Sequence, residues 1–186
     1  MAPSETATHE VDQPLGMRWT VGRVAAVVAA LAMVAFWAWI FSGAPKRSNP
    51  DYLDDRAYVK AAETRCQRLR DDLDDRGLLV PGTFDDAVER AAQLDVANRL
   101  VADLVDDLAA AAPTTGDDGV RLRGWLADWR TYVADREAYA DALRTNPEAR
   151  LFVTENRELG DSVDQTIAVF ADVNDMPACE TPGDVG

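Results

Sequence analysis

The sequence predicts an all-α protein, in which one N-terminal transmembrane helix precedes an antiparallel bundle of four or five helices closed by one disulfide. Three observations lead to this prediction. Residues 24–41, VAAVVAALAMVAFWAWIF, form an uninterrupted apolar run. After residue 50, apolar residues recur at three- and four-residue spacing, and the alternation typical of strands is nearly absent. The chain has two cysteines, and both lie in this second part.

The apolar run is long enough to cross a bilayer. Its eighteen residues would rise about 27 Å as a helix, close to the hydrocarbon thickness of about 30 Å. Aromatic and basic residues that prefer the membrane interface flank it: Trp19, Trp37, Trp39, Arg18, Arg23, Lys46 and Arg47. We therefore predict a transmembrane segment over residues 18–44.

This segment is expected to be an uncleaved signal anchor. It exceeds the 7–15 apolar residues of a secretory signal and ends in bulky aromatic side chains. A cleavage site at Ser42-Gly43-Ala44 would place Pro45 after the scissile bond, which should hinder a peptidase. No cysteine follows the run directly, which argues against a lipoprotein anchor. The alternative is a cleaved signal peptide.

Orientation is inferred from the cysteines, because the flanking basic residues do not decide it. Cys66 and Cys179 are far apart in the sequence, as expected for one disulfide in an oxidising compartment. The alternative is two unpaired, buried thiols in a cytosolic domain. The prediction is a short cytoplasmic tail (1–17), the anchor (18–44), a linker (45–50) and an extracytoplasmic acidic domain (51–186).

The charge of the C-terminal region limits its partners. Residues 51–186 carry thirty Asp and Glu against fifteen Lys and Arg. A surface this acidic repels nucleic acid and anionic lipid headgroups, so neither is expected as a ligand.

The first bundle helix is predicted from just after Pro50 to Arg76, closed by Gly77 and the pair Pro81-Gly82. One face of it is apolar at helical spacing: Tyr52, Val59, Ala62, Cys66, Leu69 and Leu73.

The second helix is predicted to begin at Thr83 as N-cap, with Asp85 and Asp86 in its first turn. It carries a short heptad seam: Phe84, Ala87, Ala91, Leu94, Asn98, Val101, Val105, Leu108 and Ala112. Asn98 is the polar exception. It could fix register as a buried amide, be partly exposed, or bond another helix.

The third helix is predicted over residues 120–144, after a loop from Pro113 to Gly119. One stripe of it is largely aromatic: Leu122, Trp125, Trp129, Tyr132, Tyr139 and Leu143. Arg136 shares this face. It could stack on the rings, present its guanidinium to a ligand or partner, or pair with a buried carboxylate, a structural ion pair being the main alternative to a functional role.

Asn146-Pro147 predicts a fresh turn with Asn146 capping it. A last helix is expected from Asp161 or Ser162 through Phe170 to Val173. A bridge between Cys66 and Cys179 would tie the C-terminal tail to the middle of the first bundle helix. In the chain-entropy model a loop this long contributes about 4–5 kcal/mol.

The residues predict no catalytic site, metal site or cofactor. The one histidine, His9, lies in the N-terminal tail, so the domain lacks an imidazole for a Ser-His-Asp site, a Cys-His site or a histidine-ligated zinc. The two cysteines do not form the C-x-x-C pair of a disulfide oxidoreductase. An acidic run could suggest calcium: Asp71, Asp72, Asp74 and Asp75. The EF-hand template fails because Arg76 takes a ligand position and Thr83 replaces the bidentate glutamate, so a solvated helix end is favoured.

Small residues recur every four positions in the apolar segment, at Gly22, Ala26 and Ala30. Such a row lets two helices approach closely, which makes a homodimer through the membrane helix a possible state.

The segments GWLADWRTYVADREAYADAL (Gly124 to Leu143) and NDMPACETPGDV (Asn174 to Val185) resemble single-pass membrane proteins of high-GC Gram-positive bacteria to which no activity is attached. The resemblance implies a short tail, one anchor and an envelope-facing domain, and it adds no functional residues.

The leading hypothesis is a membrane-anchored envelope protein whose helical domain binds another membrane or envelope protein, as a scaffold, accessory subunit or assembly factor. The alternative is a ligand-binding or sensory module that uses the aromatic stripe, with Trp125, Trp129, Tyr132, Arg136 and Tyr139 as the candidate residues. A third hypothesis is a carboxylate enzyme, against which the lack of a convergent acidic pair counts.

Overall fold

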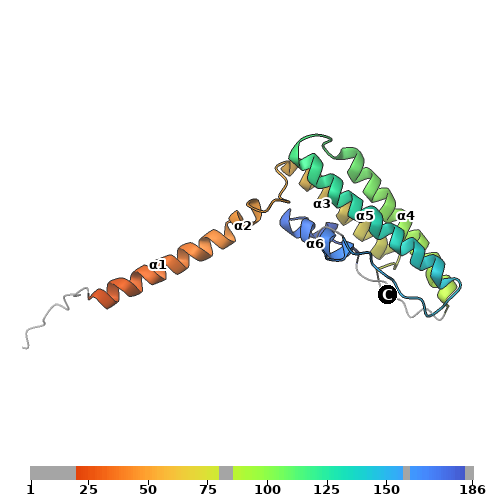
Figure 1. Cartoon of the computed structure of the whole chain (residues 1–186), viewed down its shortest axis with the longest axis horizontal. Helices are drawn as coiled ribbons and strands as arrows, with labels where there is room; N and C mark the ends of the chain where they lie inside the picture. The colour runs from red at the N-terminus through yellow and green to blue at the C-terminus, as the bar shows by residue number, and fades with distance from the viewer. Residues whose placement is uncertain (1–19, 80–85, 157–159, 183–186) are drawn as a thin grey trace, which may run out of the picture. The chain divides into compact units, whose positions relative to one another are not determined.

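The computed structural model describes residues 20–79, 86–156 and 160–182. The chain divides into two compact units, Met1–Ala44 and Pro45–Gly186. The described residues form α-helices, one short 3₁₀ helix and a single isolated β-bridge between Glu155 and Ser162, with no strand among them (Figure 1). The prediction of an all-α protein with an apolar N-terminal helix and a disulfide-closed bundle is confirmed.

In the first unit, α1 (Val21–Phe41) is one continuous helix that begins three residues before the apolar run. It is long and apolar enough to cross a membrane, with a mean hydropathy of 2.4, and none of it is buried. Aromatic rings gather at its end, where Trp37 stacks on Phe41 with ring centroids 5.7 Å apart. The predicted flanking residues Arg18 and Trp19 lie outside the described residues.

The segment predicted as a linker, 45–50, belongs to the second unit and begins with the short helix α2 (Ala44–Arg47). Lys46 Nζ donates to the Asp172 carbonyl at 2.6 Å and to the carboxylates of Asp172 and Asp175 at 3.1 and 2.9 Å. These bonds, that to Asp175 above all, raise the pKa of Lys46. The segment is therefore fastened to the second unit at its start.

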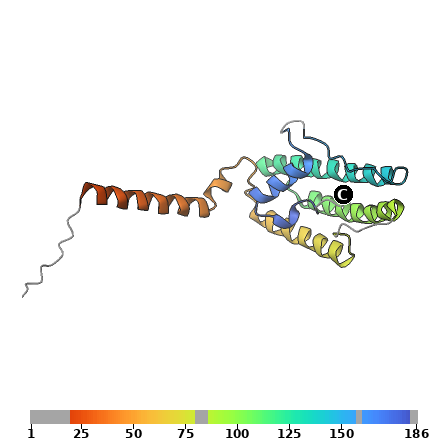
Figure 2. The ribbon, with the colours of Figure 1, turned by 90° about the horizontal axis from the view of Figure 1, so that it is seen from below.

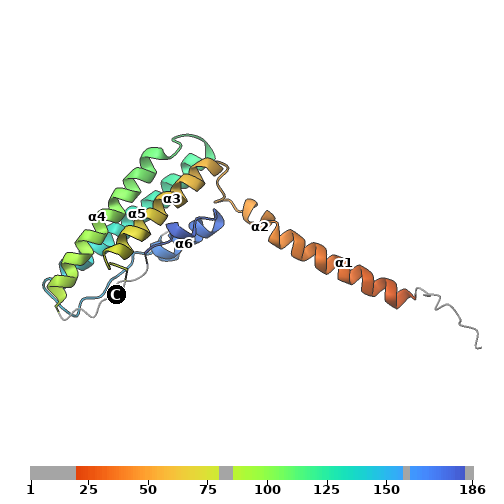
Figure 3. The same ribbon diagram turned by 180° about the vertical axis from the view of Figure 1, so that it is seen from behind.

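The second unit is an antiparallel bundle of three long helices with a shorter fourth beside one end of them (Figures 2 and 3). The first helix, α3 (Arg56–Asp75), begins later than predicted because Asp55 caps it, accepting from the backbone amides of Ala57 and Tyr58 at 3.1 and 2.9 Å. Tyr52 consequently precedes the helix. Gly77, with φ of 68°, ends the turn that follows.

The acidic run lies at the C-terminal end of α3. Asp72 pairs with Arg76 at 2.8 Å across one helical turn, and Asp71 accepts a hydrogen bond from Gln67 at 2.8 Å. Asp71, Asp74 and Asp75 are exposed and Asp72 is half-buried, as expected for a solvated helix end.

The second long helix, α4 (Ala87–Ala111), is capped by Asp86, whose side chain accepts from the Val88 amide at 2.8 Å. Asp86 is thus the cap itself, whereas we predicted it in the first turn behind Thr83, which lies outside the described residues as do Phe84 and Asp85. The middle of the predicted seam is buried: Ala91, Leu94, Asn98, Val101, Val105 and Leu108.

The third long helix, α5 (Gly116–Leu143), starts four residues before the predicted position, so the predicted loop 113–119 was too long. Gly116 adopts φ of 75°, and Asp117 and Asp118 then complement the helix dipole in the first turn. Gly119 is buried against the preceding loop, where an added Cβ would lie 2.7 Å from the Pro113 carbonyl oxygen. The Gly-Asp-Asp-Gly stretch, residues 116–119, is therefore the first turn of α5 and not part of the predicted loop.

The chain then returns along the bundle. Asn146 caps a single turn by accepting from the Glu148 amide at 3.1 Å, as predicted. Helix α6 (Val163–Val173) follows, with Ser162 before it, and the 3₁₀ helix η1 (Pro177–Cys179) ends the fold. The Cys66–Cys179 disulfide joins η1 to α3, with Cα atoms 5.0 Å apart.

Helix α5 is the centre of the unit, since it packs along both α4 and α6, while α3 packs on α4 and η1. The main apolar core lies among all four helices, and a smaller one joins the start of α4 to the end of α5.

Candidate binding groove

The aromatic stripe of α5 is buried as core. Trp125, Trp129, Tyr132 and Tyr139 expose 3, 1, 2 and 4% of their surfaces. Adjacent rings meet edge to face, with centroids 6.3 Å apart for Trp125–Trp129 and 5.9 Å for Trp129–Tyr132. This geometry is favourable for aromatic pairs and stabilises the interior.

Arg136 is buried with the stripe, at 1% exposure. Its Nε donates to Asn98 Oδ1 at 2.8 Å, its Nη1 donates to the Tyr132 hydroxyl at 3.3 Å, and the guanidinium lies 5.5 Å from the Tyr132 ring centroid. Within the described part of the chain, no carboxylate forms an ion pair with it. The expected structural ion pair is therefore not found among the described residues, and the Arg136 guanidinium lies against the Tyr132 ring of the stripe.

Asn98 accordingly bonds another helix, one of the alternatives considered from sequence. Its Oδ1 is used by Arg136, while its Nδ2 has no hydrogen-bond partner among the described residues. The polar pair therefore joins α4 to α5 inside the core.

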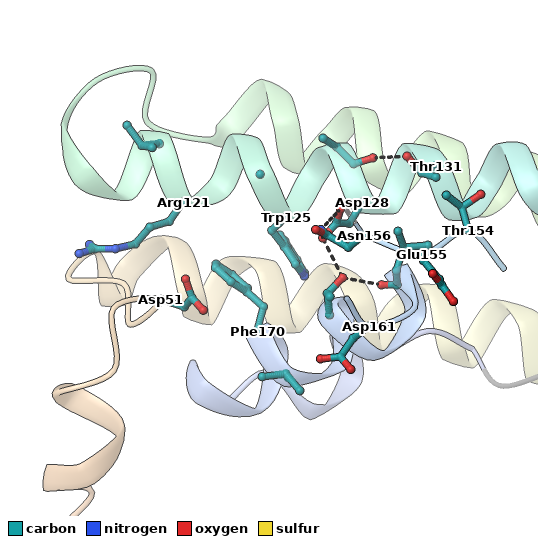
Figure 4. Close-up of a pocket in the computed structure, with 16 residues that line it drawn as sticks. Asp51, Arg121, Trp125, Asp128, Thr131, Thr154, Glu155, Asn156, Asp161 and Phe170 are labelled. Carbon is teal, nitrogen blue, oxygen red and sulfur yellow. Dashed lines mark hydrogen bonds between the residues drawn. The ribbon is translucent and has the colours of Figure 1, made fainter. Parts of the chain in front are cut away.

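A groove with a volume of about 710 Å³ lies between α5, α6 and the segment before α6 (Figure 4). Of the five residues proposed from the aromatic stripe, Trp125 alone lines it. The described lining of the groove combines acids, hydroxyls, one amide, one base and several apolar side chains. Its side chains include those of Asp51, Val120, Arg121, Trp125, Asp128, Thr131, Thr154, Glu155, Asn156, Asp161, Val163, Thr166, Val169 and Phe170.

The floor of the groove is apolar. Trp125 stacks on Phe170, with centroids 5.1 Å apart and planes inclined by 20°. Trp125 Nε1 donates to the Ile167 carbonyl at 3.4 Å, which satisfies the indole. Val120 and Val169 also line the groove and are 61% and 52% exposed. The groove therefore offers apolar surface that the bundle itself does not cover.

One end of the groove is built by carboxylates that hold the segment before α6. Asp128 accepts from Asn156 Nδ2 at 3.0 Å and from the Thr166 hydroxyl at 2.8 Å. Seven residues further along α5, which is about two helical turns, Asp135 accepts from the Thr154 amide and hydroxyl at 2.7 and 2.9 Å. These bonds position the groove wall on a rigid helix.

The groove is negatively charged. Asp51, Asp128, Glu155 and Asp161 line it, and Arg121 is the one base among the described residues of its lining. Arg121 is already engaged, since its guanidinium donates to Asp118 Oδ1 at 3.0 Å and to the Pro50 carbonyl. Low-dielectric walls strengthen the field of such a lining, which attracts cations.

Sequence reasoning missed this groove for a physical reason. Arg121, Asp128, Thr131 and Asp135 follow one another at helical spacing on α5, which could have indicated a polar strip beside the aromatic stripe. Their partners Thr154, Asn156 and Thr166 come from elements placed only by tertiary packing.

The small-residue row of α1 is on the surface of its helix. Gly22, Ala26 and Ala30 are exposed, and an added Cβ at Gly22 would meet nothing within 4 Å. The row is free to pack against another helix, as the homodimer hypothesis requires.

Among the described residues, no group of three or more His, Cys, Asp or Glu side chains is arranged to hold a metal ion. The carboxylates and apolar side chains of the groove suit a ligand that brings positive charge and apolar surface. In comparisons with known proteins, no family model, curated protein or solved structure matches this chain.

Proposed function

We propose that this chain is a single-pass, membrane-anchored envelope protein whose helical domain binds another protein through the groove between α5 and α6. It would act as a scaffold, accessory subunit or assembly factor. The observation that carries the proposal is the groove itself: a floor of Trp125 and Phe170, exposed apolar surface at Val120 and Val169, and exposed carboxylates of Glu155 and Asp161 at the rim.

Anchoring is supported by α1. A helix of this hydropathy with no buried face is costly to leave in water and suits the hydrocarbon core of a bilayer. The disulfide supports an oxidising location for the bundle.

The mass of the mature protein tests the anchor. We expect the full chain, retained in the membrane after carbonate extraction. A mature chain that begins after Ala44 would show a cleaved signal and overturn the anchor.

Cysteine labelling in intact cells tests the orientation. A membrane-impermeant maleimide should label Cys66 and Cys179 only after reduction. Labelling that requires lysis instead would place the bundle on the cytoplasmic side.

Site-specific photo-crosslinking tests partner binding. A photoreactive residue at Val120 or Val169 of the full-length protein in its native membrane should form an adduct with the same protein, identified by mass spectrometry. Val88 on α4 is the matched control, because it is a valine of similar exposure, 56%, that does not line the groove. Adducts formed equally from Val88, or none from either groove position, would contradict the proposal.

A small-molecule ligand is the second candidate, because about 710 Å³ lies within the range of small-ligand sites. Ligand entry would change the fluorescence of Trp125 at the floor. A change that small apolar molecules cause in the wild type and not in Trp125→Phe would favour this candidate.

A further inference from the structure

We infer that the occupant of the groove is a short, extended, basic segment of the partner protein, with a Lys or Arg at each end and apolar side chains between. This inference rests on the proposed function and specifies the chemistry of the partner.

The charge of the groove selects a cation. In the part of the lining that the structure describes, four carboxylates face one guanidinium, which is already paired with Asp118. Asp128 is held by Asn156 and Thr166, whereas Glu155 and Asp161 are exposed at the rim. The rim acids can therefore receive a new basic group without breaking the bonds that build the wall.

The length of the groove suits a peptide. Its lining runs along α5 from Val120 to Thr131, a rise of about 16 Å. An extended chain covers this distance in about five residues. Figure 4 shows Asp51 toward one end and Glu155 toward the other, so acids lie near both ends.

The middle of the groove selects apolar side chains. Trp125 and Phe170 form its floor between the two acidic ends, and Val120 and Val169 add exposed apolar surface. An apolar side chain bound here would remove its own surface and that of Val120 and Val169 from water, because Trp125 and Phe170 are already buried.

The charge also argues against other occupants. A second copy of this chain, with a net charge of −14, would bring like charge to the groove. Anionic lipid and nucleic acid are repelled for the same reason.

The test uses full-length protein in phosphatidylcholine nanodiscs and three fluorescein-labelled peptides, read by anisotropy at 150 mM salt. GRSLLSRG has the inferred pattern, GESLLSEG reverses its charge, and GRSSSSRG lacks its apolar centre. We expect GRSLLSRG to bind at least tenfold more tightly than either control. Equal binding of GRSLLSRG and GRSSSSRG would overturn the apolar part, and equal binding of GESLLSEG would overturn the charge part.

A matched pair of double variants separates the groove from general attraction to an acidic protein. Glu155→Gln with Asp161→Asn neutralises two rim acids, and Asp106→Asn with Asp107→Asn neutralises two exposed acids on α4 outside the groove lining. The groove variant should weaken GRSLLSRG binding at least fivefold and the α4 variant less than twofold. Equal weakening would overturn the inference.

The crosslinked partner distinguishes the two proposals. A crosslinked partner segment that is acidic or uncharged would overturn this inference and leave the proposed function standing. Failure of Val120 and Val169 to crosslink any protein would overturn the proposed function itself.

Discussion

Arg136 carries a permanent positive charge into the core, where an amide and a phenol receive it in place of a carboxylate. Burying an ion without a counter-ion is costly, so the hydrogen bonds and the Tyr132 ring must offset much of its desolvation. The pair formed with Asn98 is therefore a structural contact whose removal should be measurable as stability.

Arg136→Ala should lower the free energy of unfolding by about 2–5 kcal/mol, because it opens a cavity and leaves the Asn98 carbonyl oxygen without its donor. The double variant Arg136→Met, Asn98→Leu should recover much of this loss, since it removes the charge and the Asn98 amide together and leaves the Tyr132 hydroxyl as the group that loses a partner. Urea denaturation of the full-length protein in mild detergent measures both. If Arg136→Ala leaves the free energy of unfolding unchanged, Arg136 has a role in binding and not in stability.

Tyr58 makes stability depend on alkaline pH. Burial raises the pKa of its phenol to about 12, with nearby Arg65 opposing the shift, and its hydroxyl donates to the Leu108 carbonyl at 3.2 Å. The unfolded phenol ionises near its ordinary pKa of about 10, so the stabilisation is present below pH 10 and is lost as pH rises from about 10 to about 12.

The wild type should therefore lose more stability between pH 9 and pH 11 than Tyr58→Phe, as followed by urea denaturation. Tyrosinate absorbance should show one late-ionising tyrosine fewer in the variant. Equal losses in the two proteins would contradict this prediction.

At the scale of elements, glycines decide how the α4–α5 connection closes. Gly119 approaches the Pro113 carbonyl so closely that any side chain would meet backbone, while a Cβ added at Gly124, five residues further, would meet nothing within 4 Å. The same substitution should therefore have opposite effects at two positions of one helix.

Gly119→Ala should destabilise the bundle by about 1–3 kcal/mol through overpacking. Gly124→Ala is the matched control and should stabilise it by about 0.5–1 kcal/mol, because alanine loses less entropy in a helix. Thermal unfolding followed by circular dichroism would show Tm shifts of opposite sign. Similar shifts in both variants would show that the loop yields to the added methyl group.

The whole molecule depends on the disulfide for its C-terminal closure. It spans 113 residues of sequence and is assisted by Arg70, which donates to the carbonyls of Ala178 and Glu180, and by Glu63, which accepts from the Ala178 amide. The tail therefore keeps some polar contacts to α3 when the bridge is broken.

Reduction of the bridge should cost about 4–5 kcal/mol in the chain-entropy model. Cys66→Ala with Cys179→Ala should show a similar loss and should no longer respond to dithiothreitol. Urea denaturation with and without reductant checks this. A wild type that is equally stable after verified reduction would mean that the polar contacts alone hold the tail.

The sequence by itself determined the helical class, the apolar N-terminal helix, the cysteine pair and the buried aromatic face of α5, because periodicity and composition are local properties. Helix starts were less predictable, since Asp55, Asp86 and Gly116 compete with neighbouring residues that suit the same capping role. Only the tertiary structure decided that Arg136 meets Asn98, and that Asp128 and Asp135 hold the wall of a groove. Those contacts join side chains 19 to 38 residues apart, and their partners are set by how α4, α5 and α6 pack.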